Sequence, residues 1–267
     1  MKKLFMALVA AASFAAVDAE VIKYDTPADW ITTPKRELTV KDGALCVRGK
    51  TRLLSKAFWI QEGKEYVISA EIRQPSGLPR QVYVGFMPED QKGIFVSSAK
   101  VGVKNGTQTV LTKDVAKGDK VLWIKANKKW DLKLKTVTAN DAIVWNVKED
   151  LSDLPNNNYL LAAISSVETA GGEMKVTLRK PFTVNLAAGS ALRIHGDAGY
   201  MYTGGYGIPG RNDFKQFSGT VKGHSKSGFT FNQWPAGSKR GRVVLLINWN
   251  GKGSDVTEVR NVQLTVK

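Results

Sequence analysis

The C-terminal stretch of this chain restricts its fold more than any other part. Two apolar, β-branched runs, 242–249 and 256–266, flank a glycine-rich polar turn cluster at 250–255. This order of residues predicts a β-hairpin. The first run contains five consecutive apolar residues, which predicts a central strand that is buried on both faces. A sheet whose last strand lies at the C-terminus needs an early partner strand, so we expect the two ends of the chain to meet.

Short apolar runs separated by turn residues continue through most of the chain. Asp42-Gly43 lies between two short alternating runs, which is the strongest local signal for a β-hairpin. The stretch 151–163 has apolar residues at mixed spacing, but Pro155 interrupts it, so no helix is expected there. Further strands are expected at 67–73, 81–87 and 94–103. Because no sustained helical period follows residue 20, the sequence predicts an all-β fold.

The N-terminus has the organisation of a secretory signal peptide. Two lysines precede an alanine-rich apolar run at 4–17, and small residues up to Ala19 form a cleavage site. The run is too short and too rich in small residues for a membrane-spanning helix, and no other segment is predicted to cross a membrane. The sequence therefore predicts a signal peptide at 1–19 and an exported protein, either periplasmic, secreted or held at the cell surface.

The chain is strongly basic, with a formal net charge of +15. The positive charge is densest in 104–135, with nine lysines and three aspartates, and in 211–242, with seven basic residues and one aspartate. Long-range attraction favours an anionic partner, such as an acidic or sulfated polysaccharide, lipopolysaccharide or a membrane surface. Scattered lysines on strands also form a solvated face and protect sheet edges. Nucleic acid is not expected as a partner, because no helix-turn-helix, zinc-finger or aromatic single-strand-binding motif is present.

The middle region, residues 104–197, differs in character from the rest of the chain. Its expected strands are very short, and glycine and charged turns separate them at close spacing. Such spacing is more typical of a small barrel-like module than of the long strands of a sandwich.

Segments on both sides of the middle region resemble one kind of domain. Residues 38–71 contain a hairpin, a Glu-Gly-Lys-Glu-Tyr turn and a strand of serine and apolar residues. Residues 214–221 have two aromatic residues followed by glycine, and 242–249 with 259–262 fit a closing strand pair. In this order, the segments resemble jelly-roll carbohydrate-binding modules of families 4, 9 and 22. The resemblance covers about half of the chain that follows the signal peptide.

The middle region resembles a short β-module that recurs in bacterial surface proteins. The segments 113–124 and 181–193 match its opening turn and its closing stretch. Together the two resemblances imply a jelly-roll β-sandwich of the galactose-binding-like kind, formed by 20–103 and 198–267. The middle region would be inserted into this sandwich as a small β-barrel-like module.

The last strand departs from the family pattern at the position of a structural calcium ion. In the family this strand commonly opens with an acidic pair, whereas Arg260 and Asn261 stand at the matching positions here. A calcium ion would need Glu258 or Asp255 as its ligand instead. We therefore expect no metal and no other cofactor.

Carbohydrate-binding modules stack sugars on tryptophan or tyrosine rings and bind the hydroxyl groups with neighbouring polar side chains. Here Trp249 lies between two asparagines, Trp234 follows an Asn-Gln pair, and Tyr206 lies between glycines. Large residues also plug the ends of sandwiches, which is the competing interpretation for both tryptophans. Arginine side chains suit a carboxylate or sulfate group. The expected ligand-binding residues are Tyr202, Tyr206, Arg211, Trp234, Arg242, Asn248, Trp249 and Asn250.

The sequence holds few candidates for catalysis. Its two histidines have no zinc-binding spacing, and neither a nucleophile elbow nor a P-loop is present. A glycosidase would need two converging carboxylates, for which Asp197 and Asp213 are candidates. A jelly-roll polysaccharide lyase would need a tyrosine or histidine base and a cation that neutralises the uronate. Its candidates are Tyr202, Tyr206, His195, His224 and Arg211.

The sequence thus predicts a non-catalytic, exported protein that binds a polysaccharide, and the charge favours an anionic one. Two alternatives stay open at this stage: a structural or adhesive protein of the cell envelope without sugar binding, and the polysaccharide lyase. The sequence leaves both a monomer and an oligomer of unknown size open.

Overall fold

The structure is a computed structural model that describes residues 19–267, except 79, 136, 162, 163, 197, 198, 227, 250 and 252. Nearly all of its regular structure is β, in antiparallel sheets, which confirms the predicted all-β class. Apart from Ala19, the expected signal peptide lies outside the described residues. Asn250 and Asp197 also lie outside them.

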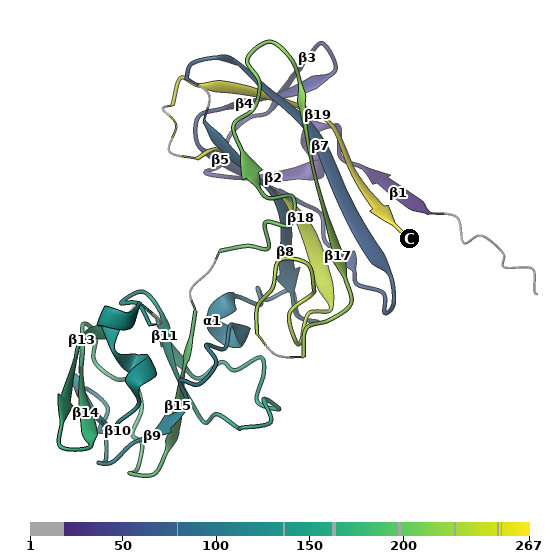
Figure 1. Cartoon of the computed structure of the whole chain (residues 1–267). Coiled ribbons are helices and arrows are strands. Elements are labelled where there is room, and N and C mark those ends of the chain that lie inside the picture. The colour runs from purple at the N-terminus through teal and green to yellow at the C-terminus, as the bar shows by residue number, and fades with distance from the viewer. Residues whose placement is uncertain are drawn as a thin grey trace, which may run out of the picture.

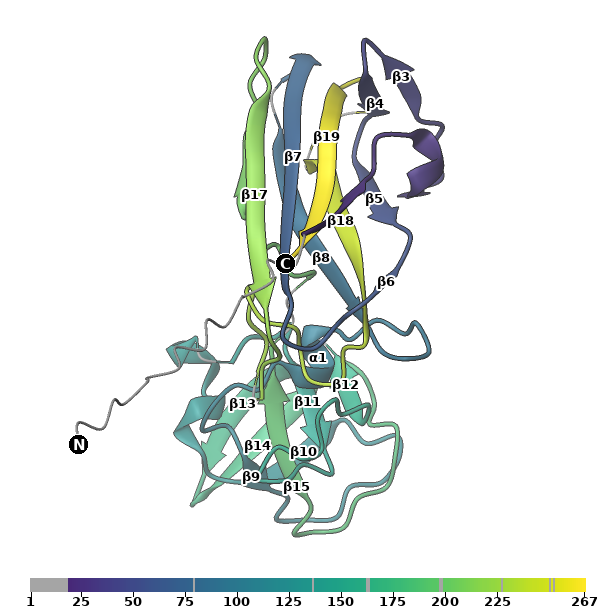
Figure 2. The same ribbon diagram turned by 90° about the vertical axis from the view of Figure 1, so that its right-hand side faces the viewer.

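Two six-stranded sheets form a sandwich (Figure 1). Sheet A has the order β17-β7-β19-β4-β3, with β1 paired to β19, and Figure 2 shows β17, β7 and β19 side by side. Sheet B has the order β16-β8-β18-β5-β2, with β6 paired to β18. The strands of sheet A are β1 (Glu20–Lys23), β3 (Thr39–Lys41), β4 (Ala44–Arg48), β7 (Glu65–Ser76), β17 (Lys215–Lys222) and β19 (Val256–Val266). Those of sheet B are β2 (Trp30–Thr33), β5 (Thr51–Ser55), β6 (Phe58–Trp59), β8 (Gln81–Glu89), β16 (Tyr206–Gly207) and β18 (Arg240–Trp249).

The middle region forms two further sheets. Sheet C has the order β12-β11-β15-β9, and sheet D has the order β10-β14-β13. Their strands are β9 (Thr109–Val110), β10 (Val121–Lys125), β11 (Ala142–Trp145), β12 (Tyr159–Leu161), β13 (Ile164–Ala170), β14 (Glu173–Leu178) and β15 (Ala191–His195). These described strands close no barrel, whereas the turn spacing predicts a barrel-like module. Neighbouring edges of the two sheets meet at an isolated bridge between Leu111 and Ile124 rather than along a ladder.

One helical turn lies where the sequence predicts a strand at 94–103. It is α1 (Ser98–Val101), and Figure 1 shows it between the sandwich and the middle region. Ser98, Ala99 and Val101 are buried. The strand prediction is wrong because a short apolar run has the same pattern in a buried helical turn as in a buried strand. The other described helices are the 3-10 turns η1 (Pro27–Asp29), η2 (Lys128–Trp130) and η3 (Leu132–Leu134).

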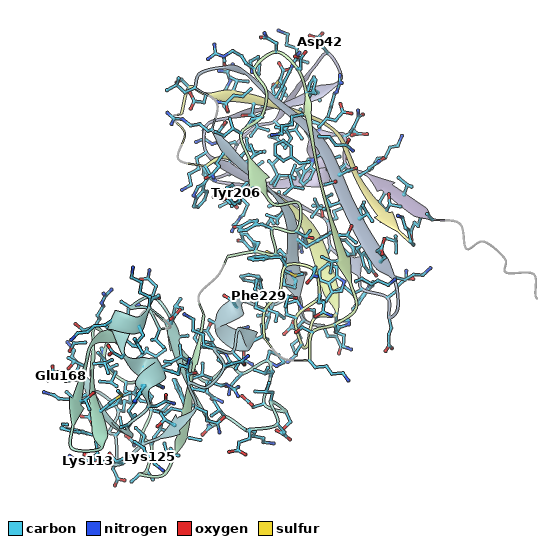
Figure 3. The ribbon with its side chains drawn as sticks, in the orientation of Figure 1. Asp42, Lys113, Lys125, Glu168, Tyr206 and Phe229 are labelled. Atoms are coloured by element: carbon cyan, nitrogen blue, oxygen red, sulfur yellow. The ribbon has the colours of Figure 1, made fainter. Side chains whose placement is uncertain are left out.

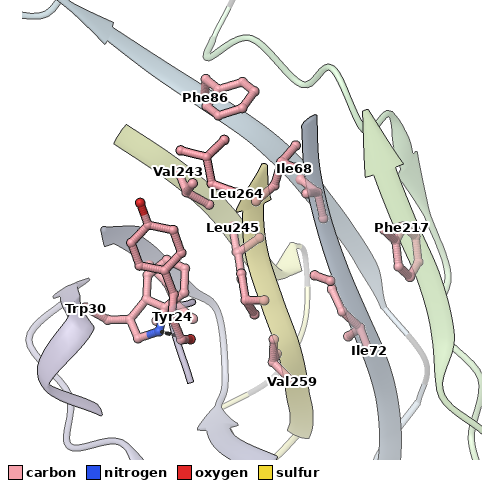
Figure 4. Close-up of a cluster of buried hydrophobic side chains, with 14 of the residues drawn as sticks. Tyr24, Trp30, Ile68, Ile72, Phe86, Phe217, Val243, Leu245, Val259 and Leu264 are labelled. Atoms are coloured by element: carbon pink, nitrogen blue, oxygen red, sulfur yellow. Dashed lines mark hydrogen bonds between the residues drawn. The ribbon is translucent and has the colours of Figure 1, made fainter. Parts of the chain in front are cut away.

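Two separate clusters of buried hydrophobic side chains lie inside these sheets. The first fills the space between sheets A and B and draws on residues 24–86 and 201–266; Figure 4 shows part of it. The second lies between sheets C and D and draws on residues 111–194. The two clusters share no residue. The domain boundaries at 103/104 and 197/198 stay predictions.

The two C-terminal runs form central strands but not a hairpin. β18 lies between β8 and β5 in sheet B, and β19 lies between β7 and β4 in sheet A. Residues 243–248 are all buried, which confirms the expected strand with two buried faces. The hairpin prediction is wrong because the two strands lie in opposite sheets. The five consecutive apolar residues of β18 can be buried on both faces in the middle of sheet B. β19 instead buries Val259, Val262, Leu264 and Val266 in the core from the opposite sheet.

The first described strand pairs with the last one and is the early partner that the sequence predicts. β1 pairs with β19, so that Glu20 lies opposite Val266, and Figure 1 shows β1 beside the C-terminus. The Asp42-Gly43 hairpin is also confirmed, because β3 and β4 pair across it. Asp42 and Gly43 have positive φ angles of 50° and 73°, as this kind of two-residue turn requires.

Asn248 ties the end of β18 to neighbouring backbone and side chains. Its amide donates a hydrogen bond to the Gly49 carbonyl at 3.1 Å, and its side-chain oxygen accepts one from the Thr257 hydroxyl at 2.6 Å. The residue is fully buried and has a φ of 54°, a conformation that asparagine adopts more readily than most residues.

We expect Asn248→Ala to lower the free energy of unfolding by about 2–3 kcal/mol, because it leaves buried polar partners unpaired and strains the backbone. Urea unfolding followed by tryptophan fluorescence measures this loss. Asn232→Ala, at an exposed position, is the matched control and should change the free energy by less than about 0.5 kcal/mol. A loss in Asn248→Ala as small as that of the control would contradict this role.

Candidate functional site

A row of side chains crosses the outer face of sheet B. Residues directly opposite each other on paired strands point to the same face of a sheet. The neighbours of this row along β5, β8 and β18 belong to the core between sheets A and B, so the row faces away from that core. In order across β2, β5, β18, β8 and β16, the row consists of Thr33, Arg52, Leu246, Tyr83 and Tyr206.

Aromatic rings gather around Tyr83 on this face. Its ring centroid lies 4.8 Å from that of Tyr202, 5.6 Å from that of Tyr206 and 6.4 Å from that of Trp249. The Tyr202 ring in turn lies 6.2 Å from that of Tyr200. Ring pairs at such separations are in favourable contact. With Phe95, whose ring lies 5.2 Å from that of Tyr200, they form the aromatic face: Tyr83, Phe95, Tyr200, Tyr202, Tyr206 and Trp249.

Local packing explains how Tyr200 and Tyr202 reach the outer face. Met201 between them is fully buried in the sandwich core, so its two neighbours point the other way. Two backbone hydrogen bonds, at 2.8 and 3.0 Å, join Met201 to Phe86 of β8. Gly85 permits this close approach, because a Cβ atom at that position would lie 1.9 Å from the Met201 carbonyl oxygen.

Two cations border the aromatic face. The Lys50 ammonium lies 3.6 Å from the centroid of the Trp249 ring, which is a cation–π contact. The Arg52 guanidinium donates to the Tyr200 hydroxyl and, at 3.0 Å, to the Thr33 hydroxyl. These contacts hold both positive charges beside the rings. Burial raises the pKa of the nearby Tyr202 hydroxyl, which stays protonated and able to donate at neutral pH.

The aromatic face borders a cleft with a volume of about 870 Å³. This volume lies within the range of ligand sites in proteins. Sheet B supplies Tyr83, Leu246 and Trp249 to the lining, and β12 of the middle region supplies Tyr159 and Leu161. None of the described residues that line the cleft is a carboxylate or a histidine. The cleft is therefore apolar and aromatic, with positive charge at its border.

Three of the predicted ligand-binding residues come together here. Tyr202 and Trp249 line the cleft. Tyr206 lies next to it, against Tyr83, with 67% of its surface exposed (Figure 3). Tyr206 and Trp249 approach one another because β8 pairs with both β16 and β18, and the bridge between Met201 and Phe86 places Tyr202 beside them.

Four other predicted ligand-binding residues have structural contacts instead. Trp234 is 1% exposed, and its ring packs against three aromatic rings of the sandwich core, so no ring face is open to a sugar. Asn248 is enclosed by the hydrogen bonds described above. Arg242 donates to a buried carboxylate of β8 at 2.6 Å, and Arg211 donates to a backbone carbonyl at 2.8 Å. We leave these four residues out of the proposed site, and Asn250 lies outside the described residues.

The structure also places residues at the site that the sequence analysis does not single out. A signal for Tyr83 was available, because Val82 and Val84 alternate with it and point into the core, which directs Tyr83 to the outer face. No local pattern marks the rest, since their proximity results from strand pairing and from the position of the middle region. They are Lys50, Arg52, Phe95 and Tyr159.

The two histidines, candidates for a lyase base, do not line the cleft. His195 is fully buried in the middle region, where its Nε2 accepts a hydrogen bond from Arg193 at 2.8 Å and its Nδ1 lies 2.9 Å from the Ala99 carbonyl oxygen. Burial, with a smaller effect of the Arg193 charge, lowers the pKa of His195 to about 4. The Nε2 of His224 lies 3.1 Å from the Ser238 carbonyl oxygen.

The carboxylates considered for calcium are paired with arginine. Asp255 lies 3.7 Å from Arg80, and Glu258 lies 2.6 Å from Arg73. In the described part of the chain, no three His, Cys, Asp or Glu side chains cluster in a way that would hold a metal ion.

No protein-family model matches this chain, and the search of curated proteins finds no match. Among the described residues, no helix is both long enough and apolar enough to span a membrane.

His195 should make the protein less stable in acid. Its pKa is depressed in the folded state, so between about pH 6.5 and pH 4 the unfolded chain binds a proton here that the folded protein does not bind. We expect the free energy of unfolding to fall by up to about 3 kcal/mol over this range as the pH is lowered. His195→Gln should flatten this part of the pH profile, whereas Asn232→Ala, which removes no ionisable group, should not. Urea unfolding at a series of pH values measures this, and equal profiles for the three proteins would contradict it.

Proposed function

We propose that this protein binds a polysaccharide at the cleft beside the aromatic face without cleaving it. The observation that carries the proposal is the aromatic face, six rings in a connected series beside a cleft on one face of a sheet. A pyranose ring presents an apolar surface of C–H groups that packs against tyrosine and tryptophan rings. Its hydroxyl groups then reach polar atoms at the border of the contact.

Two features support an anionic polysaccharide. Lys50 and Arg52 lie beside the rings, where they are within reach of a carboxylate or sulfate group on a stacked sugar. The net charge of +15 attracts such a polymer over a longer range. Export by the predicted signal peptide would bring the protein to the polysaccharides outside the cell.

The composition of the lining favours binding over cleavage. A glycosidase needs a pair of carboxylates at the scissile bond, and the described lining offers none. Of the lyase candidates named from the sequence, Tyr202 lies in the lining and Tyr206 beside it, without either histidine. The lyase and the structural or adhesive envelope protein become outcomes of the experiments below.

Affinity electrophoresis of the mature protein in gels that contain polygalacturonate, dextran sulfate, dextran or glucomannan tests the proposal. We expect retardation in the two acidic gels. Retardation by none of the four would refute polysaccharide binding of this kind and favour the structural role. An absorbance increase from unsaturated uronate on incubation with polygalacturonate would identify a lyase instead.

Trp249→Ala should weaken binding by about tenfold or more, because truncation of a central aromatic contact typically costs more than 1 kcal/mol. Trp59→Ala is the matched control: Trp59 is 62% exposed and pairs with the opposite end of β18, on the order of 30 Å away. We expect the control to bind as the unmodified protein does. Equal retardation of the two variants would argue against the aromatic face as the binding surface.

Lys50→Gln should weaken binding to polygalacturonate and dextran sulfate several-fold and reduce the dependence of binding on salt, because one screened attraction is removed. Any binding to dextran or glucomannan should not change. Lys56→Gln, also at an exposed position on sheet B's side of the sandwich, is the control for net charge. If both lysine variants lose the same affinity, the overall charge and not the Lys50 ammonium attracts the polymer.

A further inference from the structure

The cleft lies between the outer faces of two different sheets. On sheet C, Ile143, Leu160 and Ile194 point into the core of the middle region. The alternate residues therefore point to the other face, where Tyr159 and Leu161 pack with buried small residues of β11 and α1. The outer face of sheet B carries the aromatic face, and residues from both outer faces line the same cleft.

α1 covers only part of the apolar surface of sheet C. Ala99 of α1 belongs to the cluster on this face and also lines the cleft. Tyr159 lies on β12, which is at the edge of sheet C, and it is only partly buried. An aromatic side chain that is partly buried at the lining of an apolar cleft presents surface that a ligand can cover.

The two sides of the cleft are connected by direct contacts rather than by the chain alone. α1 contacts the middle region at two points. His195 lies against the Ala99 carbonyl, and the backbone N–H of Asn156 donates a hydrogen bond to the Lys100 carbonyl at 2.9 Å. A sandwich loop also touches the middle region, because a Cβ atom at Gly237 would lie 2.7 Å from Pro155. Figure 1 shows α1 at the junction of the two parts.

We propose that Tyr159 is a second binding residue and that the polysaccharide is held between sheet C and the aromatic face of sheet B. This inference rests on the proposed function and extends it to the middle region. A cleft of about 870 Å³ is near the upper end of the range for small-molecule sites, so it has room for a chain of several sugar units rather than a single sugar. Such a chain contacts the sandwich and the middle region at once and stabilises both by mass action.

Tyr159→Ala is the direct test, with the same four polysaccharide gels and with titration calorimetry on polygalacturonate or dextran sulfate. We expect at least about a fivefold loss of affinity. Tyr159→Phe keeps the ring and should bind within about twofold of the unmodified protein, since the contact is with the ring face. Thr169→Ala, at an exposed position on β13 of the same region, should have no effect. Thermal unfolding without polysaccharide shows whether each variant is folded.

Hydrogen exchange with and without polysaccharide gives a second measurement that does not depend on a variant. We expect bound polysaccharide to slow exchange both in β8 and β18 of the sandwich and in β12 of the middle region. Slower exchange in the sandwich alone would overturn the inference.

The two proposals fail in different ways. If the unmodified protein and Tyr159→Ala bind equally well while Trp249→Ala binds weakly, the role of Tyr159 is refuted and the aromatic face still binds the polysaccharide. If the unmodified protein is retarded in none of the four gels, the proposed function is refuted and the role of Tyr159 with it.

Discussion

Strand β18 is apolar on both faces. Its inward face packs in the core of the sandwich, and its outward face packs with the aromatic face. Val243, Leu245 and Ile247 point inward and pack in the core between sheets A and B. Val244 and Leu246 point outward, where Tyr83, Tyr200, Tyr202 and Trp249 of the aromatic face pack with them. The same run of residues therefore stabilises the fold and, through Leu246, lines the cleft. Each buried apolar side chain contributes about 1.5–3 kcal/mol relative to an exposed one.

The position of β18 in the centre of sheet B also brings distant segments to the site. Its partners are β5 and β8, which carry Arg52 and Tyr83, and β8 in turn pairs with the segment that contains Met201 and Tyr206. Side chains from segments that precede and follow the middle region in the sequence therefore meet on the outer face of sheet B. In a chain that alternates between two sheets, as in a jelly roll, neighbouring strands of one sheet are rarely consecutive in the sequence. Side chains from distant segments therefore often lie on the same face.

Arg193, Asp153 and His195 form a hydrogen-bonded network in the middle region. Arg193 is almost completely buried, donates to Asp153 at 2.6 Å and to His195 at 2.8 Å, and so neutralises one group and orients the other. Removal of any one member would leave a buried polar partner unpaired. Because His195 also contacts α1, this network contributes to the position of the middle region beside the cleft.

The sequence alone determines the features that depend on local pattern: the all-β class, the Asp42-Gly43 hairpin and the burial of β18 on both faces. Local pattern suffices there because turn geometry and the burial of a strand are properties of a few consecutive residues. It does not distinguish Trp234 from Trp249, since both stand beside amide residues. Only the tertiary structure decides that Trp234 is in the core and Trp249 is at the cleft, and that the two C-terminal strands belong to opposite sheets. These outcomes result from long-range strand pairing. The pairing depends on how the apolar faces of all the strands are buried at the same time.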